Sequence, residues 1–325
     1  SGSQADASLT LTINTGKVGS RATAWNGTTT PTSTDENTIN RLTVGIFDAS
    51  TKKVKTIVEL TSATTGGNSL SVSGNTATAK IVTTSLATGD DVLVAANAPA
   101  GNFAGVADET GFNAKTEGIE SAVLSSSDNT KEINTNIPMY GASTLNGSGS
   151  AFTATVSVQH QLAKITLDNL SVDFAQDGPY KSATFKPTEF FLVNVPENLA
   201  FNKEAVNGTN HFHGCNIASS DYSSLSWITS LPSNWGSYKE FLATGALSGS
   251  ALSGIASSGT EKYGSKSFFY VTPSTDDTDN GKMKLIIAGD FDANGSGTTE
   301  KVFYPVAINA TYDAAGNATA ADGGT

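Results

Sequence analysis

Strict alternation of apolar and polar residues is the feature that most constrains the fold of this chain. Near its start, Leu9, Leu11 and Ile13 alternate with threonine and asparagine, as a strand with one buried face requires. Clusters of Gly, Asn, Asp, Ser and Thr, which favour turns, separate ten further segments that read as strands: Leu42–Phe47, Val54–Leu60, Ala77–Val82, Val92–Ala96, Ala151–Val158, Leu162–Leu167, Phe190–Val195, Phe268–Thr272, Met283–Ala288 and Val302–Ile308.

Helical signals are few and short. Only Glu117–Leu124 and Ser237–Thr244 resemble helices, and neither has the length of a crossover helix in an α/β fold. Many strands with few helices predict an all-β protein of the sandwich type, with short helices in its connections.

The length of 325 residues predicts two domains. A segment rich in Gly, Ser and Asn, Thr144–Ser150, precedes a long strand pattern, and we place the boundary just after it. The prediction is an N-terminal domain over residues 1–157 and a C-terminal domain over residues 158–325. The segment Asn202–Asn234 is long for a loop, and we expect it to decorate the second domain.

Charge and cysteine content exclude several classes of protein. The formal charge is −11 and only 15% of residues are charged, which argues against nucleic acid as a main partner, since phosphate contacts need clustered Lys and Arg. A single cysteine, Cys215, excludes an intrachain disulfide or a CxxC motif. No apolar run approaches the ~18 residues of a membrane span. An acidic, Thr-, Ser- and Asn-rich chain suits a secreted or surface β-protein.

Motifs of nucleophilic catalysis and of phosphate binding are missing from the sequence. Of the three histidines, His160 stands before an apolar strand. A hydrogen-bonded histidine at the start of a strand is favoured there over a catalytic base. We therefore predict that the protein is not an enzyme and uses no cofactor.

Two segments carry residues that could bind a metal. His211, His213 and Cys215 would share one face of an extended segment and are zinc-ligand types, but a fourth ligand is not evident. We favour no metal there.

Asp290, Asp292 and Asn294 match the first half of a calcium-binding loop, yet Lys301 stands at the twelfth position, where a bidentate Glu belongs. Because Asn294-Gly295 is also a tight-hairpin dipeptide between two strands, we favour a hairpin turn and keep weak calcium binding as the alternative.

Arginine is used at two positions only. Arg41 directly precedes a strand, where we expect a structural role, whereas Arg21 lies in a small, polar stretch after the first strand. Exposed stretches of this kind are favoured sites of proteolysis. A cut between Arg21 and Ala22 would free the first strand, and an ordinary surface arginine remains the alternative.

Several motifs, in order, resemble the fimbrillins, the major shaft subunits of type V pili. The resemblance spans the whole chain. The segments that carry it are Ala7–Ile13, Gly19–Ala22, Asn40–Phe47, Val92–Asn97, Ile137–Gly141, His160–Ile165, Phe268–Val271 and Phe303–Val306.

The resemblance implies two tandem transthyretin-like β-sandwich domains and export through the outer membrane as a lipoprotein precursor. It implies cleavage after Arg21 by an arginine-specific protease, followed by filling of the vacated groove by a strand from a neighbouring pilin subunit. Leu9, Leu11 and Ile13 would then be the self-complementing strand of the uncleaved protein, which we expect as a detachable edge strand of the first sandwich.

This sequence departs from the fimbrillin pattern after Phe303–Ile308. Family members continue with further strands, of which the last is the donor, so we expect the second domain to lack its last strands. The alternative function is a tip or accessory adhesin of the same fimbria, which binds a glycan or a protein on a host or bacterial surface through Asn202–Asn234. Three tryptophans in predicted loops, Trp25, Trp227 and Trp235, could stack on sugars.

Overall fold

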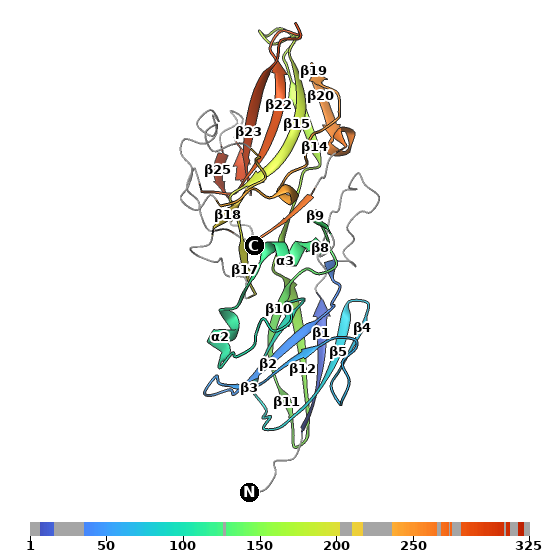
Figure 1. The fold of residues 1–325 in the computed structure, drawn as a ribbon, viewed down its shortest axis with the longest axis vertical. Coiled ribbons are helices and arrows are strands. Elements are labelled where there is room, and N and C mark those ends of the chain that lie inside the picture. Colours follow the sequence, from blue (N-terminus) through green and yellow to red (C-terminus); the bar gives the residue numbers. More distant parts are fainter. Residues whose placement is uncertain are drawn as a thin grey trace. The chain divides into compact units, whose positions relative to one another are not determined.

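The computed structural model describes residues 7–15, 36–125, 128–201, 210–216, 236–264, 268–272, 274, 281–308, 310–312 and 318–321. They form two compact units (Figure 1). The first unit contains the described residues up to Ala163 together with residues 198–201, and the second contains residues 164–197 and those from 210 onward. Strands dominate both units, which confirms the predicted all-β fold.

One continuous path of strands builds the first unit, in the order β3-β2-β6-β10-β12-β1-β5-β4, with β11 paired to β12. The strand β12 belongs to two layers: it pairs with β1 through Ala151 to Val158, and with β10 through Gln159 and His160. The bounds are β1 (Ala7–Thr15), β2 (Leu42–Phe47), β3 (Val54–Leu60), β4 (Ser69–Ser73), β5 (Thr76–Thr83), β6 (Asp91–Ala96), β10 (Met139–Thr144), β11 (Asn146–Ser148) and β12 (Ala151–His160).

The apolar faces of the two layers enclose the main core of the first unit. Alternation decides which side chains enter it: every second residue of β1, β5 and β12 is buried. The strand β2 is buried along its whole length because a second apolar cluster covers its other face. That cluster includes Phe47, Phe103, Phe112 and Phe201, and the rings of Phe103 and Phe112 stack with centroids 4.1 Å apart.

Each of the two helical segments that the sequence predicts contains a short helix. The segment Glu117–Leu124 contains α3 (Ile119–Val123) and Ser237–Thr244 contains the 3-10 helix η2 (Glu240–Leu242), while α2 (Glu109–Asn113) was not predicted. Asp108 begins α2 by accepting a hydrogen bond from the Gly111 amide at 2.8 Å, which is the usual role of an aspartate N-cap. None of the helices in the described ranges has the length and apolar character of a membrane span.

Short strand pairs complete the first unit. The strand β7 (Thr116–Gly118) pairs with β17 (Asn198–Ala200), and β8 (Leu124–Ser125) pairs with β9 (Asp128–Glu132). Because β17 lies far along the sequence, the first unit also includes a later, separate stretch of chain.

The second unit is centred on a four-stranded sheet in the order β19-β15-β22-β23. One face of this sheet carries a core of Phe191, Val193, Ile286 and Ala288, packed with Cys215. The bounds of the strands in this unit are β13 (Ala163–Thr166, its first residue in the first unit), β14 (Asn169–Asp173), β15 (Thr184–Val193), β16 (Val195–Pro196), β18 (His211–Phe212), β19 (Leu252–Ser253), β20 (Ile255–Gly259), β21 (Phe268–Val271), β22 (Lys284–Asp292), β23 (Glu300–Ala307), β24 (Ala310–Tyr312) and β25 (Ala318–Ala321); a further 3-10 helix, η3, spans Thr260–Tyr263.

Two details refine the predicted organisation. The strand β12 runs three residues beyond the predicted end of the first domain, and Val158 pairs with Thr15 of β1. After β23 the chain forms two more short strands, β24 and β25, which pair with each other. The division of the chain into two domains at residues 157 and 158 stays a prediction.

Candidate functional site: the seat of the first strand

The strand β1 lies inside its sheet, with β12 on one side and β5 on the other. It runs parallel to β12 and antiparallel to β5. The expectation of an edge strand is therefore wrong. The period-2 pattern says which face of a strand is buried, but it does not say how many neighbours the strand has.

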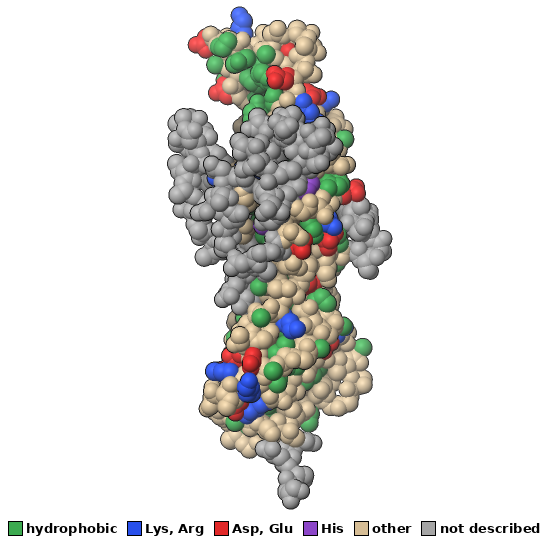
Figure 2. Space-filling view, turned by 60° about the vertical axis from the view of Figure 1, so that its left-hand side comes forward, with side chains coloured by type: hydrophobic (Ala, Val, Ile, Leu, Met, Phe, Trp, Pro, Cys, Tyr) green, Lys and Arg blue, Asp and Glu red, His purple; other side chains and the backbone are tan. Residues whose placement is uncertain are grey.

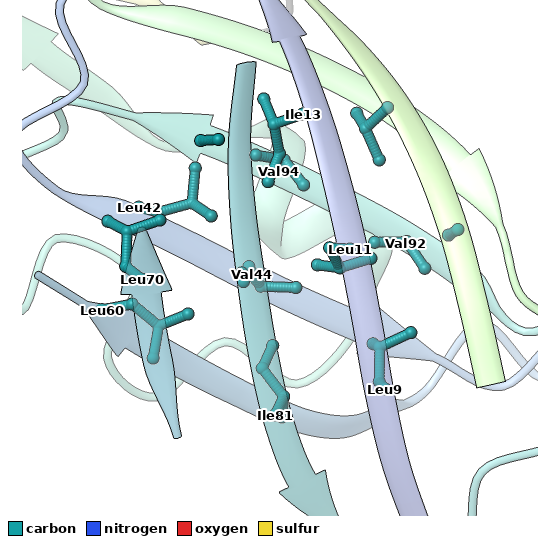
Figure 3. Close-up of a cluster of buried hydrophobic side chains, with 14 of the residues drawn as sticks. Leu9, Leu11, Ile13, Leu42, Val44, Leu60, Leu70, Ile81, Val92 and Val94 are labelled. Carbon is teal, nitrogen blue, oxygen red and sulfur yellow. The ribbon is translucent and has the colours of Figure 1, made fainter. Parts of the chain in front are cut away.

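The buried face of β1 is its apolar face. Leu9, Leu11 and Ile13 are each 0% exposed, and Figure 3 shows them pointing into one cluster with Val44, Val92 and Val94. Burial of a side chain of this size stabilises a fold by about 1.5–3 kcal/mol. The three together contribute on the order of 5–9 kcal/mol, which is comparable with the whole stability of a typical domain.

Backbone hydrogen bonds hold both ends of β1. The Ser8 amide donates to the Ser150 carbonyl at 2.9 Å, and the Thr15 amide donates to the Asn75 carbonyl at 3.0 Å. The Thr15 hydroxyl donates to the same carbonyl at 3.0 Å. If β1 left, the facing backbone groups of β5 and β12 would lose their partners, and unpaired edges of this kind recruit other strands.

We use the word seat for the space between β5 and β12 that β1 fills. From the sequence, β5 and β12 were not identified as the walls of this seat. Two repeats of alanine and threonine, residues 76–79 and 153–155, mark its two walls. That repetition is the signal that could have found them. The buried side chains of the walls are Ala77, Ala79, Ile81, Phe152, Ala154, Val156 and Val158.

The predicted cleavage site, Arg21 and Ala22, lies outside the described residues. It follows the last residue of β1, Thr15, within the same stretch of sequence. Arg41, the other arginine, forms an ion pair with Glu59 at 3.2 Å, in keeping with the structural role predicted for it.

The segment with His211, His213 and Cys215 is buried in the second unit. His213 Nδ1 lies 3.1 Å from the Cys215 carbonyl oxygen, and burial lowers the pKa of His213 to about 4. Within the described ranges, no three His, Cys, Asp or Glu side chains gather as a metal site would require.

The calcium-like segment is the turn of the β22–β23 hairpin. It is longer than the two-residue turn that Asn294-Gly295 suggested, because Asp292 organises the loop. Its carboxylate accepts hydrogen bonds from the amides of Ser296 at 3.2 Å and Gly297 at 2.7 Å. These backbone donors, Gly297 first, hold the pKa of Asp292 below its ordinary value. The hairpin prediction is therefore confirmed.

His160 ends β12, where its Nε2 lies 2.9 Å from the Glu36 carbonyl oxygen. This contact ties β12 to the residues that precede β2. The hydrogen-bonded role expected for this histidine is confirmed, but His160 lies at the end of a strand and not at the start of one.

Two carboxyl groups of the first unit have raised pKa values. Burial raises the pKa of Glu117, on β7, to about 8. Burial, and then the neighbouring Asp91, raise the pKa of Glu109 to about 7. Asp91 in turn is hydrogen-bonded to Lys52. Neither carboxyl group lies on β5, β12 or β1.

Most of the predicted ligand-binding loop, namely residues 202–209 and 217–234, lies outside the described residues. The three tryptophans, Trp25, Trp227 and Trp235, also lie outside the described residues. Their stacking on sugars stays a prediction.

The fold is shared with solved bacterial proteins. Two crystal structures of candidate cell adhesion proteins from Parabacteroides distasonis ATCC 8503 match 94% of this chain. One matches over 81% of its own length, with a TM-score of 0.61, and the other over 85%, with a TM-score of 0.59. Each is 15% identical to this chain, so the likeness defines a fold class. A search of curated protein sequences finds no match.

The sequence model of the major fimbrial subunit protein (FimA) family matches residues 7–169, which is just over half of the chain and includes β1 and both walls of its seat. The chain belongs to this family. It is thus a member of a family of structural subunits of cell-surface fimbriae, which associate with other subunits. The resemblance noted in the sequence is confirmed.

Proposed function

We propose that the protein is a pilin subunit that polymerises by strand exchange after an arginine-specific protease cleaves between Arg21 and Ala22. The observation that carries the proposal is the interior position of β1, with three wholly buried apolar side chains and a neighbouring strand on each side. An arginine placed shortly after this strand is where a single cut would separate it from the rest of the chain.

Cleavage changes how β1 is held. In the uncut chain β1 is covalently attached, so a competing strand must displace a segment that cannot diffuse away. After the cut, only burial and the ladder hydrogen bonds retain it, and a strand from a second subunit competes for the same apolar slot and backbone partners. A donor on one surface and an acceptor on another make a head-to-tail contact, which propagates into a filament.

The experiment compares two single-arginine variants. Arg21→Ala is expected to fold normally and to give an unshifted band after treatment with an arginine-specific protease, and to remain monomeric by electron microscopy. The matched control is Arg41→Lys, which removes the other arginine, keeps the charge next to Glu59 and should still be cut and assemble. Cleavage of the Arg21→Ala protein at the unchanged position would refute the assignment of the scissile bond.

The alternative function is that of a tip or accessory adhesin in the same fimbria. It is favoured by the likeness to two proteins described as candidate cell adhesion proteins. A glycan or protein on a host or bacterial surface would bind through residues 202–234. Cleaved protein that stays monomeric and binds a glycan array would support the adhesin, whereas filaments support the shaft subunit.

We further propose that the protein reaches the surface as a lipoprotein precursor exported through the outer membrane, as family membership suggests. Metabolic labelling with a radioactive fatty acid tests this step. Label that enters the precursor and is lost together with the N-terminal fragment on cleavage is the expected result, and an unlabelled precursor in outer-membrane fractions would contradict it.

A further inference from the structure

The side chains that flank β1 are smallest at the centre of its seat. The register places Leu11 directly opposite Ala79 on β5 and directly opposite Ala154 on β12. Both alanines are buried on the same face as Leu11, at 0% and 4% exposure. Leu11 is therefore the one bulky side chain in a row of three, and we call the space between the two alanines the alanine gap.

The flanking side chains on either side of the gap are larger. Leu9 lies between Ile81 and Phe152, which are both large and buried. Ile13 lies between Ala77 and Val156. The size of the flanking side chains thus varies along the seat, and it is smallest at the place of Leu11.

We propose that the alanine gap selects the strand that can occupy the seat, by the size of the side chain at the place of Leu11. The partner is a strand with alternating apolar residues that carries a leucine-sized side chain at the place of Leu11. This inference rests on the proposed strand exchange for its partner, but the gap itself acts in the uncut chain as well.

Side-chain size matters because alternation alone decides only which face of an inserted strand is buried. A slip of one residue would turn every apolar side chain outward and is excluded by burial. A slip of two residues keeps the apolar face of β1 inside and brings Leu9 or Ile13 to the gap, so a bulky side chain still fills it. A strand with a small side chain at the place of Leu11 would instead leave a cavity between Ala79 and Ala154, and a cavity is costly because surrounding atoms collapse into it only partly.

The first test uses the uncut chain and measures the equilibrium constant of folding by urea unfolding. Leu11→Ala should lower this constant by about 30-fold or more, and by more than Leu9→Ala does, because Ile81 and Phe152 can lean into the space left at position 9. Leu11→Val and Leu9→Val form a milder pair that gives the same order if the alanine variants fail to fold.

A compensating variant separates the gap from burial in general. Ala79→Leu should destabilise the parent chain by overfilling the gap, yet it should restore stability when combined with Leu11→Ala. The matched control combines Ala79→Leu with Leu9→Ala and should show no recovery. Equal losses at positions 9 and 11, or recovery in the control, would overturn the inference.

The second test uses the full chain after cleavage at Arg21. A fluorescent synthetic peptide with the sequence of residues 7–15 should exchange into the cleaved protein, and its Leu11→Ala version should bind at least tenfold more weakly than its Leu9→Ala version. Exchange without that difference would overturn the role of the gap and leave strand exchange intact. Absence of any exchange, together with absence of filaments, would refute the proposed function, and the unfolding measurements would still decide the gap.

Discussion

Leu11→Asp should be the single most damaging polar substitution in β1. Leu11 is 0% exposed, and its two cross-strand neighbours are alanines that offer no polar partner. The variant loses the burial of a leucine, about 1.5–3 kcal/mol, and places a carboxylate in an apolar core, which costs several kcal/mol more when the charge has no partner. The total is at least about 5 kcal/mol, as large as the entire stability of many domains.

The assay is urea unfolding of the uncut chain, monitored by far-UV circular dichroism, together with limited proteolysis. We expect a loss of the first unit's cooperative transition, or expulsion of β1 that exposes it to protease. The matched control is Thr10→Asp, on the outward face of β1 opposite Lys80, where the change should stay within about 0.5 kcal/mol. A Leu11→Asp protein with the parent's urea midpoint would refute the burial of β1.

Three further predictions concern charged groups. Burial raises the pKa of Glu117 from 4.5 to about 8, so the folded state holds a proton that the unfolded state releases. The free energy of unfolding should therefore fall by several kcal/mol at most as the pH rises from 4.5 to 8. Glu117→Gln should flatten this part of the pH profile of the melting temperature. Asp90→Ala should destabilise the first unit by about 1–3 kcal/mol in chemical unfolding. The reason is that the buried Asp90 carboxylate accepts hydrogen bonds from Lys55 Nζ at 2.7 Å and from the Ala87 amide at 2.8 Å. An unchanged unfolding midpoint would show that water replaces the carboxylate as acceptor. Asp292→Ala should lower the melting temperature at neutral pH. Because backbone hydrogen bonds depress the pKa of Asp292, the difference in melting temperature between variant and parent should disappear as the pH falls below 3.8, through the folded-state pKa. Addition of calcium should not alter this trend.

The alternation of apolar and polar residues predicted where the strands of this protein lie better than it predicted which strands pair with one another. The apolar alternation at Leu9, Leu11 and Ile13 identified a strand and its buried face because side-chain direction follows from the backbone geometry of a single strand. Whether that strand lies at an edge or in the interior depends on pairing with Ala151–His160, which is far away in sequence. That is why the edge position expected for β1 is wrong.

The same limit explains the candidate sites. The sequence favours a turn role for Asp292 and keeps calcium binding as the alternative, and the backbone amides of Ser296 and Gly297 that donate to its carboxylate show the turn. Ala79 and Ala154, in the walls of the seat, are small apolar residues, and nothing in their chemistry marks them in the sequence. They matter because they lie on either side of Leu11, and this placement is known only from the pairing register of β1 with β5 and β12.

Pairing on both sides of β1 also has a mechanical consequence. A strand at the edge of a sheet can be peeled off one hydrogen bond at a time. A strand with ladders on both sides, pulled along its own axis, must shear both ladders together, and the force is shared among all of their bonds. A fibre whose subunits are joined through such a strand would resist the drag of flowing liquid without any covalent link between them.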